Sequence, residues 1–163
     1  MLTQMTKVLT LLRHGESEVG LGQKEDFSRK LTSTGKLKLE RLTNVLATRS
    51  LEYSAVVSST ATRTRKTTEI VIKAIQVKEC TFLDALYLAD VQTIVDLCGN
   101  LPNECSKVMI VGHNPGLSAF LSFLTGEYQP SLQPGMMAMI DFDVDAWEVA
   151  ITRGMGNLVE ILQ

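Results

Sequence analysis

The chain has 163 residues, a formal net charge of −2 and 45% hydrophobic residues. This size and composition suit a globular protein, so we expect residues 1–163 to form a single domain. A general nucleic-acid-binding surface is excluded, because contacts to phosphate backbones need a basic face and the chain has no block of basic residues. No apolar run approaches the roughly 20 residues that span a bilayer, and the first residues lack a signal-peptide core. We therefore expect a cytoplasmic protein with no nucleic-acid or membrane partner.

Short apolar runs alternate along the chain with longer amphipathic segments, which is typical of an α/β protein. Three of the four predicted strands are almost continuously hydrophobic, as expected for strands covered on both faces, so we predict a mostly parallel sheet in a three-layer α/β/α sandwich. The predicted strands are Lys7–Arg13, Ser54–Ser59, Lys78–Leu83 and Lys107–Gly112, and the predicted helices are Thr32–Arg49, Thr60–Ile75, Asp90–Cys98 and Asn114–Gly126.

The C-terminal third has a different pattern. Its two strand-like runs, residues 135–144 and 147–153, are joined by the short Asp145-Ala146 connection. This pattern predicts a C-terminal hairpin at the edge of the sheet. No linker, repeat or second domain is visible.

Both histidines of the chain, His14 and His113, come directly after a predicted strand. The carboxyl ends of parallel strands meet at one edge of an open α/β sheet, where ligands bind, so we expect the two histidines to converge. Arg13 precedes the first histidine, and Arg63 lies near the first turn of the helix after the second predicted strand. Two guanidinium groups, two imidazoles and two helix N-termini predict a site for a compact dianion, for which phosphate is the natural candidate.

Each of these residues also has a structural interpretation. A histidine at a strand end can be a satisfied core residue, Arg63 and Arg65 can lie on a solvated helix face, and the GHNPG segment can be a turn with a helix cap. Their joint placement at three strand ends favours the site. A metal is disfavoured because two separate histidines supply too few ligands and the arginines repel a cation, so we expect no metal and no cofactor. The chain also lacks the GxSxG element of serine hydrolases, a Walker loop and a GxGxxG motif.

Three segments resemble, in order and spacing, the three signatures of the histidine phosphatase superfamily, whose first motif is RHG. The small size of the chain and its DFSRKLTSTG and ALYLAD segments are similar to the compact SixA-type branch of phosphohistidine phosphatases. The resemblance implies a phosphoglycerate-mutase-like fold. The three matching segments are LLRHGES, VVSSTATRTRKTTEIV and VMIVGHNPGLS.

The resemblance also implies roles for the predicted site residues. His14 would be the nucleophile, Arg13 and Arg63 would hold the phosphoryl group, and His113 would be the second histidine of the pocket. Asn114, next to His113, is a further candidate for substrate binding. The reaction would pass through a phospho-His14 intermediate that water hydrolyses. We expect His113 to act as a protonated donor, whereas His14 must present an unprotonated nitrogen.

One departure from the superfamily bears on the substrate. Mutases and many phosphomonoesterases of the superfamily carry a glutamate proton donor a few residues after the third strand, a place that corresponds to Leu88 here. Asp84 and Asp90 are offset from it, which leaves open whether either is the general acid. An alkoxide needs such an acid, whereas an imidazole leaving group, with a conjugate-acid pKa of about 6.5, needs far less help.

The predicted function is therefore a phosphatase acting on phosphohistidine in a partner protein, such as a histidine phosphotransfer domain. Two alternatives remain: a phosphomonoesterase for a small phosphorylated substrate, and a noncatalytic phosphate-binding regulatory module.

Overall fold

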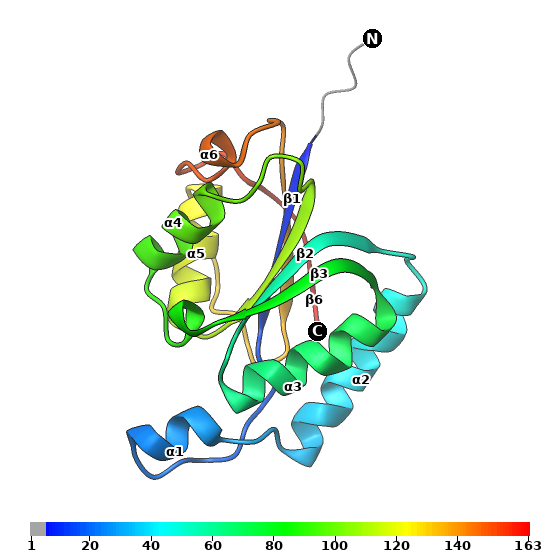
Figure 1. The fold of residues 1–163 in the computed structure, drawn as a ribbon, viewed down its shortest axis with the longest axis vertical. Helices are drawn as coiled ribbons and strands as arrows, with labels where there is room; N and C mark the ends of the chain where they lie inside the picture. The colour runs from blue at the N-terminus through cyan, green and yellow to red at the C-terminus, as the bar shows by residue number, and fades with distance from the viewer. Residues whose placement is uncertain (1–5) are drawn as a thin grey trace.

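In a computed structural model of the protein, which describes residues 6–163, six strands form one mixed sheet (Figure 1). The strands are β1 (Lys7–Arg13), β2 (Glu52–Ser59), β3 (Gln76–Leu83), β4 (Lys107–Gly112), β5 (Met137–Phe142) and β6 (Asn157–Leu162). Their spatial order is β3-β2-β4-β1-β5-β6. The first four strands are parallel, and β5 and β6 run antiparallel to their neighbours. The prediction of a mostly parallel sheet is confirmed.

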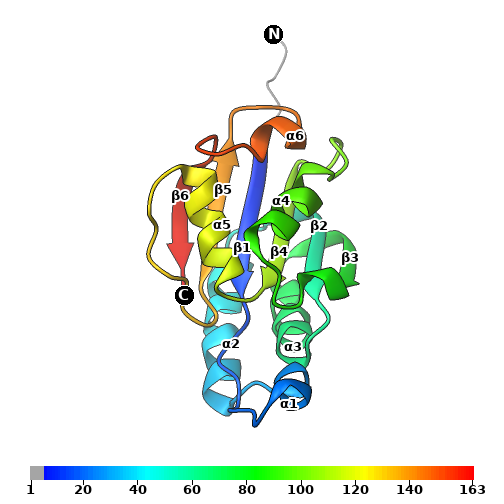
Figure 2. The same cartoon turned by 90° about the vertical axis from the view of Figure 1, so that its left-hand side faces the viewer.

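Helices cover both faces of this sheet, which confirms the three-layer arrangement. α2 (Ser33–Ala47) and α3 (Thr62–Val71) lie on one face. α4 (Val91–Gly99), α5 (Gly116–Thr125) and α6 (Trp147–Ala150) lie on the other, toward the viewer in Figure 2. The short α1 (Gln23–Ser28) precedes α2, and 3-10 turns span Ile72–Ala74 and Asp84–Leu86. Within residues 6–163, no helix is long and apolar enough to cross a membrane.

The alternation of side chains along β1 explains why the sequence of this strand is almost continuously hydrophobic. Leu9 and Leu11 are buried in the cluster that includes Phe120 of α5. Leu12 is buried on the other face, in the cluster that includes Leu39 of α2. Full burial of a leucine side chain contributes about 1.5–3 kcal/mol, so each face of the strand is stabilised by its own helix layer. β1 ends at Arg13, where the chain leaves the two helix layers, and the candidate site begins at this end of the strand.

The predicted C-terminal hairpin is right in its edge position and wrong in its second strand. Residues 147–153 start with the helical turn α6, and the strand that pairs with β5 is the later β6. Trp147, Ala150 and Ile151 are the buried residues of this segment, at a spacing of i, i+3 and i+4, whereas Val149 is exposed. The indole Nε1 of Trp147 donates to the Cys105 carbonyl at 2.8 Å. This tertiary anchor favours the helical turn over the alternating pattern that suggested a strand.

The backbone of α5 approaches the segment before α4 so closely at Gly116 that a larger side chain there is unfavourable. A Cβ added to Gly116 would lie 2.0 Å from the Ala89 carbonyl oxygen, which is backbone and cannot yield cheaply. We expect Gly116→Ala to lower the free energy of unfolding by about 1–3 kcal/mol through overpacking. Gly99→Ala is the matched control, because a Cβ there meets no atom within 4 Å. Urea denaturation of both variants checks this, and equal stabilities would contradict the close approach.

Candidate active site

The chain segments that follow β1, β2 and β4 meet at one edge of the sheet because these three strands are neighbours. His14 comes directly after β1, Arg63 lies in the first turn of α3 after β2, and His113 comes directly after β4. The His14 N–H donates to the Gly112 carbonyl at 3.1 Å, which ties the ends of β1 and β4 together. All three residues line a cavity of about 260 Å³, as does Arg13. The structure thus brings together the four residues that the sequence singled out.

The hydrogen bonds of the His14 ring fix its tautomer. Its Nδ1 lies 2.7 Å from the Gly15 carbonyl oxygen. A carbonyl oxygen only accepts hydrogen bonds, so Nδ1 carries the proton and Nε2 carries the lone pair. The side chain is 7% exposed, and burial, together with the charges of Arg63 and Arg13, lowers the pKa of His14 to about 4. At neutral pH His14 is therefore an uncharged imidazole with its lone pair on Nε2.

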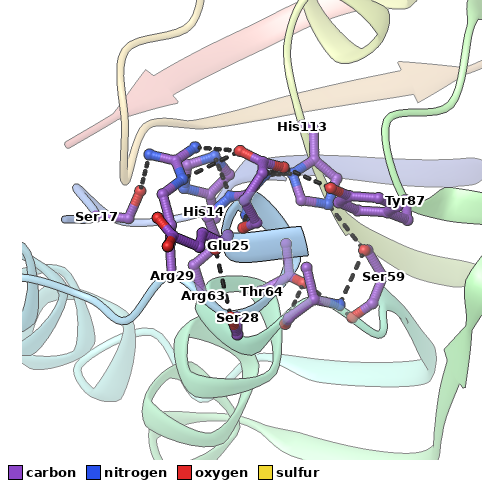
Figure 3. Close-up of polar contacts among 12 residues, drawn as sticks. His14, Ser17, Glu25, Ser28, Arg29, Ser59, Arg63, Thr64, Tyr87 and His113 are labelled. Atoms are coloured by element: carbon purple, nitrogen blue, oxygen red, sulfur yellow. Dashed lines mark hydrogen bonds and ion pairs between the residues drawn. The ribbon is translucent and has the colours of Figure 1, made fainter. Parts of the chain in front are cut away.

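Arg63 is the central side chain of the site, with only 1% of its surface exposed (Figure 3). Its Nε donates to His14 Nε2 at 3.3 Å, and its Nη2 donates to His113 Nδ1 at 3.2 Å. Its two terminal nitrogens also contact Asp26: Nη1 donates to the backbone carbonyl at 2.6 Å and Nη2 to carboxylate Oδ2 at 3.2 Å. A buried guanidinium with these partners is not part of a solvated helix face. The interpretation as a residue of a solvated helix face applies to Arg65 instead, which is exposed.

His113 has a protonation state that differs from the sequence-based expectation. A guanidinium can only donate, so His113 Nδ1 accepts from Arg63, and His113 Nε2 then donates to Ser59 Oγ at 2.8 Å. Burial, followed by the charge of Arg63, lowers the pKa of His113 to about 3. The imidazole is thus neutral in this arrangement. The expectation of a protonated His113 is wrong here because the ring lies beside the buried guanidinium of Arg63. The centroid of the His113 ring lies 5.3 Å from that of the His14 ring.

Arg13 and Asn114 also line the cavity, and protein atoms engage Asn114 more fully than Arg13. Arg13 Nη1 donates to the Leu132 carbonyl at 2.8 Å, while its buried Nε has no hydrogen-bond partner among residues 6–163. Asn114 Nδ2 donates to Leu132 and to Ser131, and its Oδ1 accepts from Ser118. Asn114 therefore links the start of α5 to the 131–132 loop, and substrate binding by Asn114 stays a prediction.

The sequence analysis assigned no role to three further charged residues of the cavity, Glu16, Asp26 and Arg29. Asp26 and Arg29 belong to the segment around α1, a six-residue helix that is too short for a periodicity signal. Arg29 Nη2 lies 2.9 Å from Asp26 Oδ1, and Tyr87 Oη donates to Asp26 Oδ2. The DFSRKLTSTG segment contains both residues, but its similarity to the SixA-type branch did not by itself place them in the site.

At the end of β3 the cavity is lined by Leu88 and not by an acid. Leu88 is 54% exposed and has a φ of 48°, a backbone conformation that leucine rarely adopts. Asp84 is exposed and accepts from Thr60 Oγ1, and the Asp90 carboxylate caps α4 by accepting from the Thr93 N–H at 2.9 Å. Neither carboxylate lines the cavity. Within the described residues, no group of three or more potential ligands from His, Cys, Asp and Glu could hold a metal ion.

Comparison with known proteins finds similar sequences and similar folds. The sequence profile of the histidine phosphatase superfamily (branch 1) matches residues 9–87. An uncharacterised chloroplastic protein of Arabidopsis thaliana is 27% identical over 162 residues, which cover 91% of this chain and 72% of the relative.

Solved structures of SixA proteins share the fold. SixA from Agrobacterium tumefaciens is 26% identical, with a TM-score of 0.79 over 96% of this chain and 97% of that one. A protein histidine phosphatase SixA solved with tungstate is 22% identical, with a TM-score of 0.80 over 96% of each chain, and it supports the fold alone. The profile match over the RHG and second-motif segments and the likeness along nearly the whole chain lead to one conclusion: the protein belongs to the histidine phosphatase superfamily, in its SixA-type branch.

Proposed function

We propose that the protein is a phosphohistidine phosphatase that acts on a phosphorylated partner protein through a phospho-His14 intermediate. Its place in the superfamily supports a phosphatase. The observation that carries the proposal is the neutral His14, whose proton is fixed on Nδ1 and whose Nε2 belongs to a cavity lined by Arg13, Arg63 and His113. This is the arrangement that an in-line attack on phosphorus requires.

In the first step, His14 Nε2 attacks phosphorus and the bond from phosphorus to the substrate's ring nitrogen breaks. The electron pair returns to that nitrogen, and the substrate imidazole leaves uncharged because its other nitrogen carries a proton. In the second step, water attacks phospho-His14, the P–Nε2 pair returns to His14, and both protons of the water stay on the phosphate product. Two displacements with modest barriers replace one difficult hydrolysis.

The arginines would act on the charge of the transferring group. Arg13 and Arg63 donate N–H groups to the equatorial oxygens, and preorganised donors of this kind contribute about 10²–10³ each to the rate. An anion favours the charged form of a neighbouring imidazole, so the bound phosphoryl group itself would promote protonation of His113. His113 then becomes the donor that the sequence led us to expect, but only once the substrate has bound.

Two observations support a phosphohistidine as the substrate. The wall formed by Leu88 offers no proton to a leaving alkoxide, and the two acids that line the cavity, Glu16 and Asp26, already accept hydrogen bonds. In addition, the Agrobacterium relative is named for phosphohistidine phosphatase activity. An imidazole leaving group needs no strong acid, so the site matches a phosphoramidate better than an alkyl ester.

A series of substrates with graded leaving-group pKa tests the proposal. We expect a phosphorylated histidine phosphotransfer domain and activated aryl phosphates to be hydrolysed far faster than alkyl phosphates, with rates that fall steeply as leaving-group pKa rises. Asp84→Asn and Asp90→Asn should behave like the parent protein, because neither carboxylate lines the cavity. A flat dependence that becomes steep in one of these variants would indicate a general acid and an ordinary phosphomonoesterase. Binding of phosphate without any turnover would indicate a noncatalytic module.

A further inference from the structure

The carboxylate of Asp26 occupies the same guanidinium that the proposed reaction needs for the phosphoryl group. Asp26 Oδ2 lies 3.2 Å from Arg63 Nη2, and the backbone carbonyl of Asp26 accepts from Arg63 Nη1 at 2.6 Å. A carboxylate and a phosphoryl group present the same kind of anionic oxygen to an arginine fork. The Asp26 oxygens therefore occupy donors of Arg63 that would otherwise bind an oxygen of the substrate's phosphoryl group.

Arg63 has little donor capacity left in this arrangement. A guanidinium carries five N–H groups. Four acceptors lie within hydrogen-bond distance of Arg63: His14 Nε2, His113 Nδ1, and the carbonyl and Oδ2 oxygens of Asp26. To bind a phosphoryl group bidentately, Arg63 must give up at least one of them. The contact with His14 must also weaken, because it engages the lone pair of the nucleophile.

Asp26 has other partners that hold it near the cavity when Arg63 turns to substrate. Tyr87 Oη donates to Oδ2, and Arg29 binds Oδ1 through Nε at 3.1 Å and Nη2 at 2.9 Å. Arg29 is itself fixed by Ser17 Oγ at 3.0 Å. Burial opposes ionisation of Asp26, but the hydrogen bond from Tyr87 and the charge of Arg63 prevail and hold its pKa below the usual value. Asp26 thus stays a negative charge at the edge of the phosphate site.

We propose that Asp26 is a positioning residue that sets the affinity of the site for oxyanions, because its carboxylate competes with the substrate's phosphoryl group for Arg63. This inference rests on the proposed function, because it assumes that Arg63 binds the phosphoryl group. An incoming anion must displace the Asp26 carboxylate from Arg63, and it is also repelled by the charge of Asp26. Asp26 therefore lowers the affinity of the site for oxyanions and favours release of the phosphate product.

Asp26→Asn tests the proposal, because it removes the charge and keeps the size and the oxygen acceptor of the side chain. We expect this variant to bind inorganic phosphate and tungstate about tenfold more tightly than the parent protein, since a like charge a few ångströms from the anion has been removed. KM should fall by a similar factor with kcat within about threefold.

Glu25→Gln is the matched control, since it makes the same charge change one residue away. Glu25 is exposed, and its carboxylate accepts from the Leu21 N–H. Isothermal titration calorimetry should show oxyanion affinities within about twofold of the parent protein for this variant, by the screening that weakens exposed charges. A similar gain in both variants would assign the effect to net charge and overturn the proposal.

The remaining outcomes separate the inference from the function on which it rests. Unchanged or weaker oxyanion binding by Asp26→Asn would show that Asp26 only orients Arg63, and would overturn the proposal while the phosphatase assignment stands. A large loss of kcat for alkyl phosphates without tighter binding would make Asp26 a proton donor, which also overturns it. If the parent protein bound neither phosphate nor tungstate, the proposed function itself would fail.

Discussion

His14→Ala is expected to reduce turnover by about 10⁴-fold or more, because the variant lacks the atom that forms the covalent intermediate. The fold should persist, since the hydrogen bonds of the His14 ring within residues 6–163 are those to Gly15 and Arg63, and His14 lies at a strand end. Steady-state rates with a phosphorylated phosphotransfer domain measure the loss. Thermal unfolding followed by circular dichroism shows whether the variant is folded at the assay temperature.

The intermediate itself gives a second measurement for this variant. Mass spectrometry of the parent protein, mixed with substrate and analysed at neutral pH, should show one added phosphoryl group on His14. The alanine variant should show none. A folded His14→Ala protein that keeps more than about 1% of the parent rate, or a phosphoryl group found on another residue, would rule out His14 as the nucleophile.

Arg63→Ala is expected to lower kcat by about 10³-fold and to weaken oxyanion binding, because the guanidinium holds charge in both the ground state and the transition state. The loss of turnover should exceed the loss expected when a single hydrogen-bond donor is removed. Without Arg63, the negative charge of Asp26 is compensated only by Arg29 and Tyr87, and it repels the incoming anion. Phosphate affinity by calorimetry and turnover measured in parallel check this expectation.

Arg65→Ala provides the matched control for Arg63→Ala, with the same charge change two residues along α3. The Arg65 guanidinium lies over the Phe82 ring at 4.3 Å, and its Nε donates to the Thr60 carbonyl. We expect its rate and phosphate affinity within about threefold of the parent values, as for other exposed charges. If the two arginine variants behaved alike, Arg63 would not hold the phosphoryl group.

The pH profile of Arg63→Ala adds a signed expectation. Burial is the main reason that the pKa of His14 lies at about 4, and the charge of Arg63 lowers it further. Removing Arg63 raises this pKa toward 6.5, so a larger fraction of His14 is protonated, and thus not nucleophilic, in mildly acidic solution. The acid limb of kcat/KM should therefore move to higher pH in Arg63→Ala and stay in place in Arg65→Ala.

The sequence alone determined the part of the fold and site that depends on short-range signals. Strands such as Lys107–Gly112 are buried on both faces, so their composition identifies them without knowledge of their neighbours. Once β1, β2 and β4 are parallel, their carboxyl ends must share one edge, and His14, Arg63 and His113 follow from their places in the chain. The absence of an acid at Leu88 was visible in the same way, as a position relative to a strand end.

Tertiary structure alone decided the features that depend on partners distant in the chain. Trp147 starts a helical turn because its indole donates a hydrogen bond to the Cys105 carbonyl. Nothing in the sequence of residues 147–153 indicates that contact. Asp26 belongs to the cavity because Arg63 and Tyr87, 37 and 61 residues away in the chain, bind its carboxylate. His113 is neutral because it is buried against a guanidinium. Burial and nearby charges depend on residues that only folding brings together. The identities of the site residues could therefore be predicted from the sequence, whereas their protonation states and the competition for Arg63 could not.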